Sequence, residues 1–154
     1  MKNIWKSMLP VVAATLLAWG CEKDENMVIY ESGTNPVLTA STTTPQLIPG
    51  NETVVAMTLN WTNPDYKFNT GISSHDVQSR LEVDTAGSNF ANPNKGVVIV
   101  SRDLSRSFTV EQMNALFSGS DGMKLPFDKE YNFEVRATST IGTTAVPLTS
   151  NVIK

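Results

Sequence analysis

The sequence predicts an all-β domain, an antiparallel β-sandwich with one short helix, placed behind an N-terminal export signal. From Gly33 onward, apolar residues alternate with polar ones at a period of two, which puts successive side chains on opposite faces of a strand. Seven such short runs are separated by turn-forming Asn, Pro, Asp and Gly, as in antiparallel sandwiches. Ahead of them, an apolar segment without charges follows Lys2 and Lys6 and ends at Cys21.

The N-terminal segment has the three parts of a secretory signal peptide. Lys2 and Lys6 give the positive start, the run from Met8 to Gly20 is apolar, and small residues precede Cys21, the only cysteine. The letters LLAWGC resemble a lipobox. That resemblance implies diacylglyceryl transfer to the Cys21 thiol, cleavage after residue 20 and acylation of the new amino group. We therefore expect residues 1–20 to be a lipoprotein signal peptide.

Two alternatives compete with this interpretation. A transmembrane helix needs about 20 apolar residues, and the charge-free stretch is shorter and contains Pro10. An ordinary secreted protein cut elsewhere would leave Cys21 as an odd free thiol, which is unusual in a secreted chain. Trp19 is bulkier than the residue usual at its place in a lipobox. Two or more acyl chains anchor a protein stably, so acylation of Cys21 predicts a lipid-anchored membrane protein.

A charged run follows the cysteine, within a predicted lipidated tether over residues 21–34. Lys23, Asp24 and Glu25 resemble the signal that sends lipoproteins of Bacteroidota to the exterior face of the outer membrane. The alternative is that this run is a solvated tether without a sorting signal. The resemblance predicts a surface-exposed protein.

The chain from Cys21 to Lys154 has the length of one domain, and we expect the sandwich to occupy residues 35–154. Without Lys2 and Lys6, ten basic residues face 15 acidic ones, a formal charge of −5. This balance argues against nucleic acid or anionic lipid headgroups as partners, because both require clustered Lys and Arg. The single cysteine leaves no disulfide or thiolate metal site within the domain.

Alternation assigns faces to the predicted strands. In 55–61, the odd positions from Val55 to Trp61 are expected in the core. In 77–84 and 131–137, the charged residues, Glu82, Asp84 and Glu134 among them, are expected to face water. The remaining strands are predicted at 37–41, 97–101, 106–109 and 146–153.

One helix is expected after the strand at 106–109. Thr109 and Gln112 form a capping-box pattern, with Glu111 in the first turn. Met113, Leu116 and Phe117 follow at helical spacing, and Gly119 is a suitable stop. So short a helix is stable only when packed, so we expect it to cover one end of the core.

The motifs VLTASTTT, LNWTNPDYKF, RLEVDTAGSNFANP, FTVEQMNALF and YNFEVRATS occur in this order over about residues 35–154. The combination resembles the N-terminal domain of SusE-type outer-membrane lipoproteins. The resemblance implies an immunoglobulin/fibronectin-III-like sandwich in a system that captures starch or related polysaccharide. Its implied partners are a SusC-like TonB-dependent importer and a SusD-like lipoprotein.

The chain departs from that family at its end. Such proteins normally continue into C-terminal carbohydrate-binding modules, whereas this sequence ends partway through the expected last strand, at Lys154. We expect a truncated last strand that leaves part of its neighbour's edge unpaired, a route to strand addition. The alternative is a fragment of a longer glycan-binding protein.

Catalytic and metal-binding patterns are weak. His75 is the only histidine, and no nucleophile elbow, phosphate loop or His-Glu metal motif occurs. Carboxylates at turns usually form the turn itself. The sequence predicts no enzyme, no catalytic residue, no metal and no cofactor.

Exposed aromatic residues are candidate sugar contacts, because a ring can stack on the apolar face of a pyranose. Trp61 falls on the inward register, and Tyr131 suits a tyrosine corner. Tyr66 and Phe68 lie in a loop by composition, residues 63–69. They either cap the sandwich or contact a glycan or partner.

Asp84-Thr85-Ala86 matches a short O-glycosylation pattern of exported proteins, which makes Thr85 a candidate acceptor. Together these observations predict a non-enzymatic spacer or docking module for polysaccharide uptake, with direct glycan binding through loop aromatics as the alternative.

Overall fold

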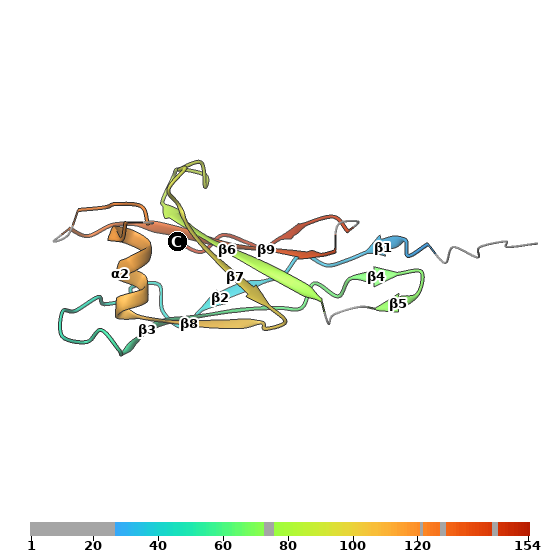
Figure 1. The fold of residues 1–154 in the computed structure, drawn as a ribbon, viewed down its shortest axis with the longest axis horizontal. Coiled ribbons are helices and arrows are strands. Elements are labelled where there is room, and N and C mark those ends of the chain that lie inside the picture. Colours follow the sequence, from blue (N-terminus) through green and yellow to red (C-terminus); the bar gives the residue numbers. More distant parts are fainter. Residues whose placement is uncertain (1–26, 73–75, 121, 127–128, 143–144) are drawn as a thin grey trace, which may run out of the picture.

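The computed structural model describes residues 27–72, 76–120, 122–126, 129–142 and 145–154. It is an elongated sandwich of two antiparallel sheets, with a helix at one end and a small three-stranded arm at the other (Figure 1). The predicted fold class, an all-β antiparallel sandwich with one short helix, is confirmed.

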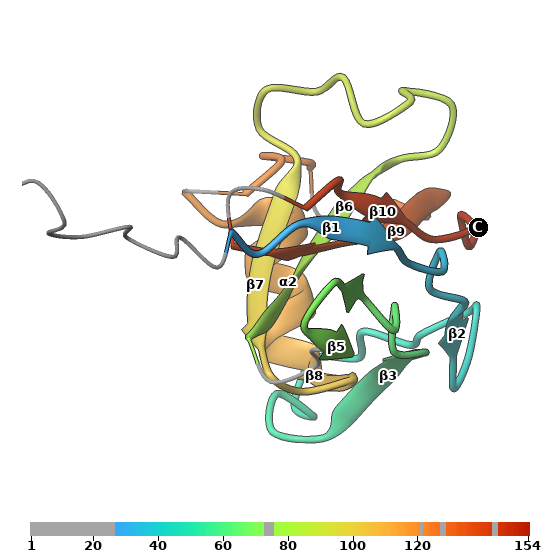
Figure 2. The same cartoon turned by 90° about the vertical axis from the view of Figure 1, so that its right-hand side faces the viewer.

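The sandwich divides its strands into layers of three and four (Figure 2). The three-stranded sheet has the order β2-β3-β8, and the four-stranded sheet has the order β10-β9-β6-β7. Every pairing within them is antiparallel. The bounds are β2 (Leu38–Ala40), β3 (Val55–Trp61), β8 (Ser105–Thr109), β6 (Val77–Thr85), β7 (Gly96–Ser101), β9 (Phe133–Ile141) and β10 (Leu148–Thr149).

The main core lies between these sheets. Met57, Leu59 and Trp61 of β3 are buried in the predicted alternation and meet Leu81 and other residues of the facing sheet. Val55 was expected to join them and does not. The pairing of β3 with β8 shifts register between Val55 and Met57, so the alternation is broken there and Val55 is 55 % exposed.

The helix α2 (Val110–Ser118) forms as its local signals predict. Thr109 caps it, the reciprocal bonds with Gln112 complete a capping box, and Gly119 ends it. Its residues Met113 and Phe117 enter the main core. No helix in the described part of the chain is long and apolar enough to cross a bilayer.

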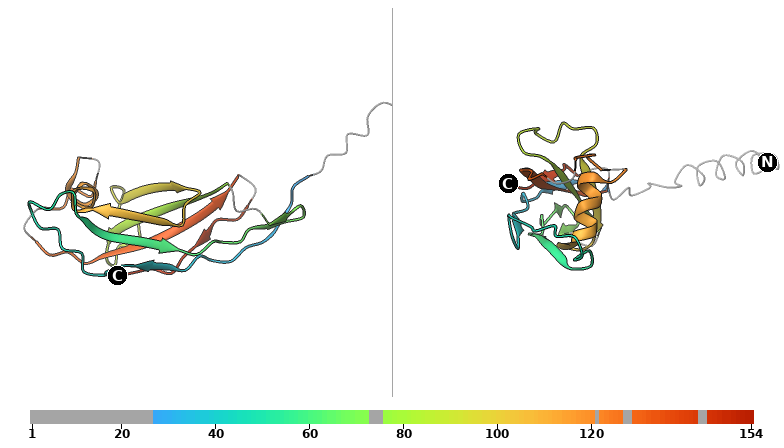
Figure 3. Two further views of the ribbon diagram at one scale, coloured as in Figure 1. Left: turned by 90° about the horizontal axis from the view of Figure 1, so that it is seen from below. Right: turned by 90° about the vertical axis from the view of Figure 1, so that its left-hand side faces the viewer.

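A third sheet forms an arm beyond the sandwich, seen lengthwise in Figure 3. Its order is β1-β4-β5, with β1 (Tyr30–Ser32), β4 (Lys67–Phe68) and β5 (Gly71–Ile72). β1 lies inside the predicted tether and β4 inside the predicted loop 63–69. β4 pairs with β5 across a short turn and with β1 across a long stretch of chain, so the tether and that loop become parts of one sheet.

The outer face of the four-stranded sheet, the face turned away from β2-β3-β8, is not fully open to water. Glu82, Asp84 and Glu134 lie on that face and are buried, contrary to the expectation that they face solvent. The alternation itself is right, since their neighbours Val83 and Val135 point into the core. The difference is the connection between β6 and β7, residues 86–95, which folds against this face and covers it. We call this connection the β6–β7 loop.

The last described residues close most of the edge of β9. After β10, the Ser150 backbone N–H bonds to the Ala137 carbonyl at 2.8 Å, and the Ala137 N–H donates to the Ser150 hydroxyl at 2.9 Å. Ile153 and Val135 then exchange two backbone hydrogen bonds. The expected unpaired edge is therefore filled as far as Val135, partly by a side chain in place of a ladder bond.

Candidate functional site

Several residues that the sequence singles out lie outside the described residues. These are the lipidation candidate Cys21, the export-signal residues Lys23, Asp24 and Glu25, and the lone histidine His75. Their predicted roles stay predictions.

Tyr66 and Phe68, the candidate glycan or partner contacts, are placed in a second core. Tyr66 is fully buried and Phe68 is 6 % exposed, packed with Val77 and Ile141 where the arm meets the sandwich. The Tyr66 hydroxyl donates to the Ser139 carbonyl at 2.7 Å and lies 3.0 Å from the Val146 carbonyl. Burial raises the pKa of Tyr66. This corrects the contact hypothesis, because neither ring has a free face for a sugar.

The other aromatic predictions agree with the structure. Trp61 is buried in the main core, and the Tyr131 hydroxyl donates back to the Pro126 carbonyl at 3.0 Å, as a tyrosine corner would. Every aromatic side chain among the described residues is buried or partly buried. The described surface therefore offers no aromatic ring that is more than partly exposed for stacking on a pyranose.

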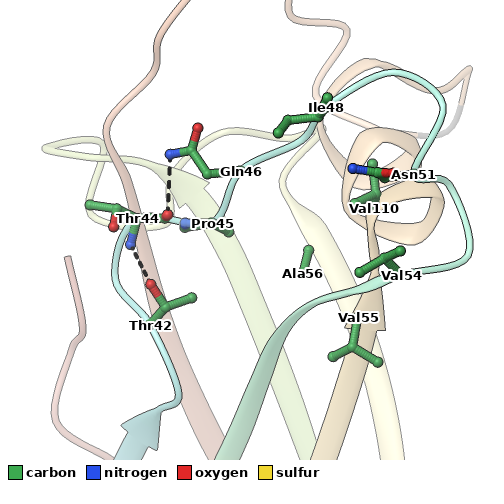
Figure 4. Close-up of a pocket in the computed structure, with 10 residues that line it drawn as sticks. All are labelled: Thr42, Thr44, Pro45, Gln46, Ile48, Asn51, Val54, Val55, Ala56 and Val110. Carbon is green, nitrogen blue, oxygen red and sulfur yellow. Dashed lines mark hydrogen bonds between the residues drawn. The ribbon is translucent and has the colours of Figure 1, made fainter.

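A pocket of about 330 Å³ lies near the N-terminus of α2, under the connection from β2 to β3 (Figure 4). Its wall is half apolar, since the broken alternation turns Val55 to the surface beside Val54 and Ile48. Polar groups line the other side, where the Thr44 N–H donates to the Thr42 hydroxyl at 3.1 Å. The lining residues are Thr42, Thr44, Pro45, Gln46, Ile48, Asn51, Val54, Val55, Ala56 and Val110.

The chemistry of this pocket is limited. Its volume is at the lower end of ligand sites, and its lining residues include no acid, base, thiol or aromatic ring. It has no nucleophile beside a general base, which covalent catalysis requires. The pocket can accept a small apolar group with one or two hydrogen bonds, and nothing in it activates a bond.

A charged cluster lies on the outer face of the four-stranded sheet. Glu82 is 5 % exposed and pairs with three cations: Arg136 at 2.8 Å, Arg80 at 3.4 Å and Lys95 at 3.7 Å. Arg136 is its direct cross-strand partner and stacks over the Phe90 ring at 4.1 Å. Phe90 itself is 6 % exposed. The cluster thus fastens the β6–β7 loop to β6 and β9.

Asp84 holds the base of the same loop and is fully buried. Its carboxylate accepts the backbone N–H of Thr85 at 2.7 Å and of Asn92 at 3.2 Å. Burial on its own would raise the pKa of Asp84, but hydrogen bonds from Ser88, Thr85 and Asn92 outweigh it, so the pKa is lowered from its usual value. The carboxylate is therefore a fixed anion that organises backbone.

Glu134 lies opposite Asp84 in the register and accepts the Gly87 N–H at 3.3 Å. Its other oxygen is buried without a partner. Within the described ranges, no three His, Cys, Asp or Glu side chains gather closely enough to hold a metal. The arrangement can position a loop, and it does not assemble an acid–base pair around a cavity.

Thr85, the candidate O-glycosylation residue, is partly buried at the end of β6, with its hydroxyl 3.4 Å from the Asp84 carboxylate. Sequence reasoning missed Phe90 and the cluster beneath it. A signal was present, because an apolar ring inside the polar, turn-rich segment SNFANP has no reason to remain in water.

These observations define a class: an all-β sandwich with inward-facing rings and a clamped loop. Comparison with known families matches residues 23–138 to the family described as SusE outer membrane protein. The match covers most of the chain, so the protein belongs to this family and is an outer-membrane protein of a Sus-type system. No curated protein matches the chain, and no solved structure does.

Proposed function

We propose that this protein is a lipid-anchored, non-catalytic spacer or docking module on the cell surface, serving polysaccharide uptake. The family assignment supplies the outer membrane and the Sus-type system. The proposal adds the anchor at Cys21, the outward orientation and the mechanical role. Its partners would be a SusC-like importer and a SusD-like lipoprotein.

The observation that carries the spacer role is the inward packing of the described aromatic rings. Carbohydrate sites commonly present a ring to the apolar face of a sugar, and here Tyr66 and Phe68 instead lock the arm onto the sandwich. The long axis runs from the arm to α2 (Figure 1). A domain rigid along that axis holds whatever binds its far end at a fixed height above its anchor.

Affinity electrophoresis separates a spacer from a glycan-binding module. The chain without residues 1–20 is run through native gels containing amylopectin or other polysaccharides, beside a non-binding protein of similar size. A spacer migrates equally in all gels. Retardation in any polysaccharide would contradict the non-binding role and return glycan recognition to this domain.

The anchor and its orientation are tested in cells. Palmitate labelling of the full chain should be lost in Cys21→Ala. Protease added outside intact cells should digest the wild-type protein, and a Lys23→Ala/Asp24→Ala/Glu25→Ala variant should be protected. Protection of the wild type would place the protein on the inner face of the outer membrane.

Co-purification of the detergent-extracted full chain tests docking. We expect a SusC-like importer or a SusD-like lipoprotein to accompany the wild-type protein. Recovery of the protein alone under mild detergent would favour a free-standing role.

A further inference from the structure

The arm ends in a run of exposed apolar side chains. Met27 is 70 % exposed, Val28 50 % and Ile29 54 %, directly before β1. Other large apolar side chains are exposed singly or as one pair, and among the described residues this is the longest consecutive run. Single exposed apolar residues are ordinary on a protein surface, whereas a contiguous group marks a contact site.

The backbone of this run is fixed. The side chain of Asn69, in the turn between β4 and β5, accepts the Ile29 N–H at 3.0 Å and donates to the Met27 carbonyl at 2.9 Å. The Asn69 N–H also donates to the Ile29 carbonyl at 3.0 Å. The backbone that carries the three exposed apolar side chains is therefore held against the arm and is not part of a free tail.

The position in the chain identifies what covers them. Only five residues, Glu22 to Asn26, separate Met27 from Cys21. Fully extended, six residue steps span at most about 22 Å. If Cys21 carries acyl chains, the arm cannot leave the neighbourhood of the lipid headgroups.

The surroundings of the run suit an interface between water and lipid. Lys67 and Glu31 form an exposed ion pair at 3.6 Å on the same small sheet, so polar groups border the apolar edge. Apolar side chains beside a lipid anchor add to membrane binding in proportion to the area they bury.

We propose that Met27, Val28 and Ile29 insert into the headgroup–acyl boundary of the bilayer that holds the Cys21 lipid. The arm then stands on the membrane and sets the tilt of the sandwich. This inference rests on the proposed lipid anchor and goes beyond it, because an anchor alone would let the domain swing freely.

The test uses the lipidated full chain reconstituted into vesicles of phosphatidylethanolamine and phosphatidylglycerol. Val28→Cys is labelled with an environment-sensitive fluorophore, which the acylated Cys21 cannot take. Val55→Cys is the matched control, since Val55 is an equally exposed valine on β3, away from the arm. We expect a blue-shifted emission, quenched by lipids with brominated acyl chains, at position 28 only.

The outcomes are separable by vesicle flotation. If the protein floats and the probe at 28 emits as in water, like the probe at 55, the arm does not touch lipid and this inference is overturned while the anchor stands. If the protein does not float, the anchor fails and this inference fails with it. Shielding at 28 that appears only after an importer protein is added would assign the surface to a protein and likewise overturn the lipid contact.

Discussion

Phe90 offers the sharpest test of the β6–β7 loop. Its ring is buried against Arg136, yet its backbone has φ +57°, a left-handed conformation that is strained for a bulky residue. Burying an aromatic side chain removes about 150–250 Å² from water, or about 4–6 kcal/mol at 25 cal/mol per Å². That figure is an upper bound because unfolded chains are partly compact. We therefore expect Phe90→Ala to lower the free energy of unfolding by about 3–5 kcal/mol.

A second variant isolates the backbone strain. Phe90→Gly loses the same ring but relieves the left-handed strain of about 1–2 kcal/mol, offset by about 0.5–1 kcal/mol of extra unfolded-state entropy. Phe90→Gly should thus be more stable than Phe90→Ala by about 0.5–1 kcal/mol, the reverse of the usual order. Asn89→Gly is the control, since Asn89 has φ +54° and asparagine tolerates that region. It should change stability by less than about 0.5 kcal/mol.

The assay is urea unfolding of the chain without residues 1–20, followed by tryptophan fluorescence. Trp61 is then the only tryptophan, so the signal reports the main core. If Phe90→Ala lowers the free energy of unfolding by less than about 1 kcal/mol, the β6–β7 loop is not held on the sheet by this ring. An alanine variant more stable than the glycine variant would refute the left-handed conformation.

Three further predictions rest on the structure, and a fourth, on Cys21, rests on the sequence. Trp61→Ala removes a buried indole and should lower the free energy of unfolding, measured in urea, by about 3–5 kcal/mol. An unchanged urea midpoint would place the ring on the surface. Thr109→Ala removes the α2 cap and should cost about 1 kcal/mol, whereas Thr109→Ser, which keeps the hydroxyl, should cost much less. Asp84 has a lowered pKa in the folded state, so its stabilising effect is complete above its unfolded pKa of about 3.9 and is lost as pH falls through the folded value. Asp84→Asn should therefore reduce the fall in the free energy of unfolding at acid pH. An unchanged fall would contradict the lowered pKa of Asp84. Cys21→Ala should leave the chain unacylated and released from membranes or held by an uncut signal, and palmitate retained in this variant would refute acylation at that residue.

Local signals predicted the parts of the fold that local interactions determine. The helix needed only Thr109, Gln112 and the spacing of Met113 and Phe117, all within nine residues, and it forms where expected. The strand at 77–85 also follows its pattern, since alternation fixes which side chains share a face.

What sequence reasoning missed depends on contacts between distant residues. The alternation of apolar and polar residues predicted that Glu82 and Asp84 point away from the core. It could not predict that residues 86–95 cover the outer face of the sheet on which they lie. Likewise β4 is two residues long and is the central strand of a small sheet, between its neighbour β5 and β1, which lies more than 30 residues earlier. Tyr66 lies in the loop before β4, as its composition predicted, but its burial depends on distant residues such as Ser139, whose carbonyl accepts its hydroxyl.

The buried charges beneath the loop contribute more to its position than to its stability. Taking Glu82 out of water costs several kcal/mol, and its attraction to the partly exposed Arg136 roughly offsets this cost, so the net gain from the pair is small. The ring of Phe90 supplies the energy of docking. A shifted loop would take Lys95 away from Glu82 and Phe90 away from Arg136, while Arg80 and Arg136 would stay paired with Glu82. We infer that the charges select one docked position and the ring holds it, which explains why a strained backbone is retained at Phe90.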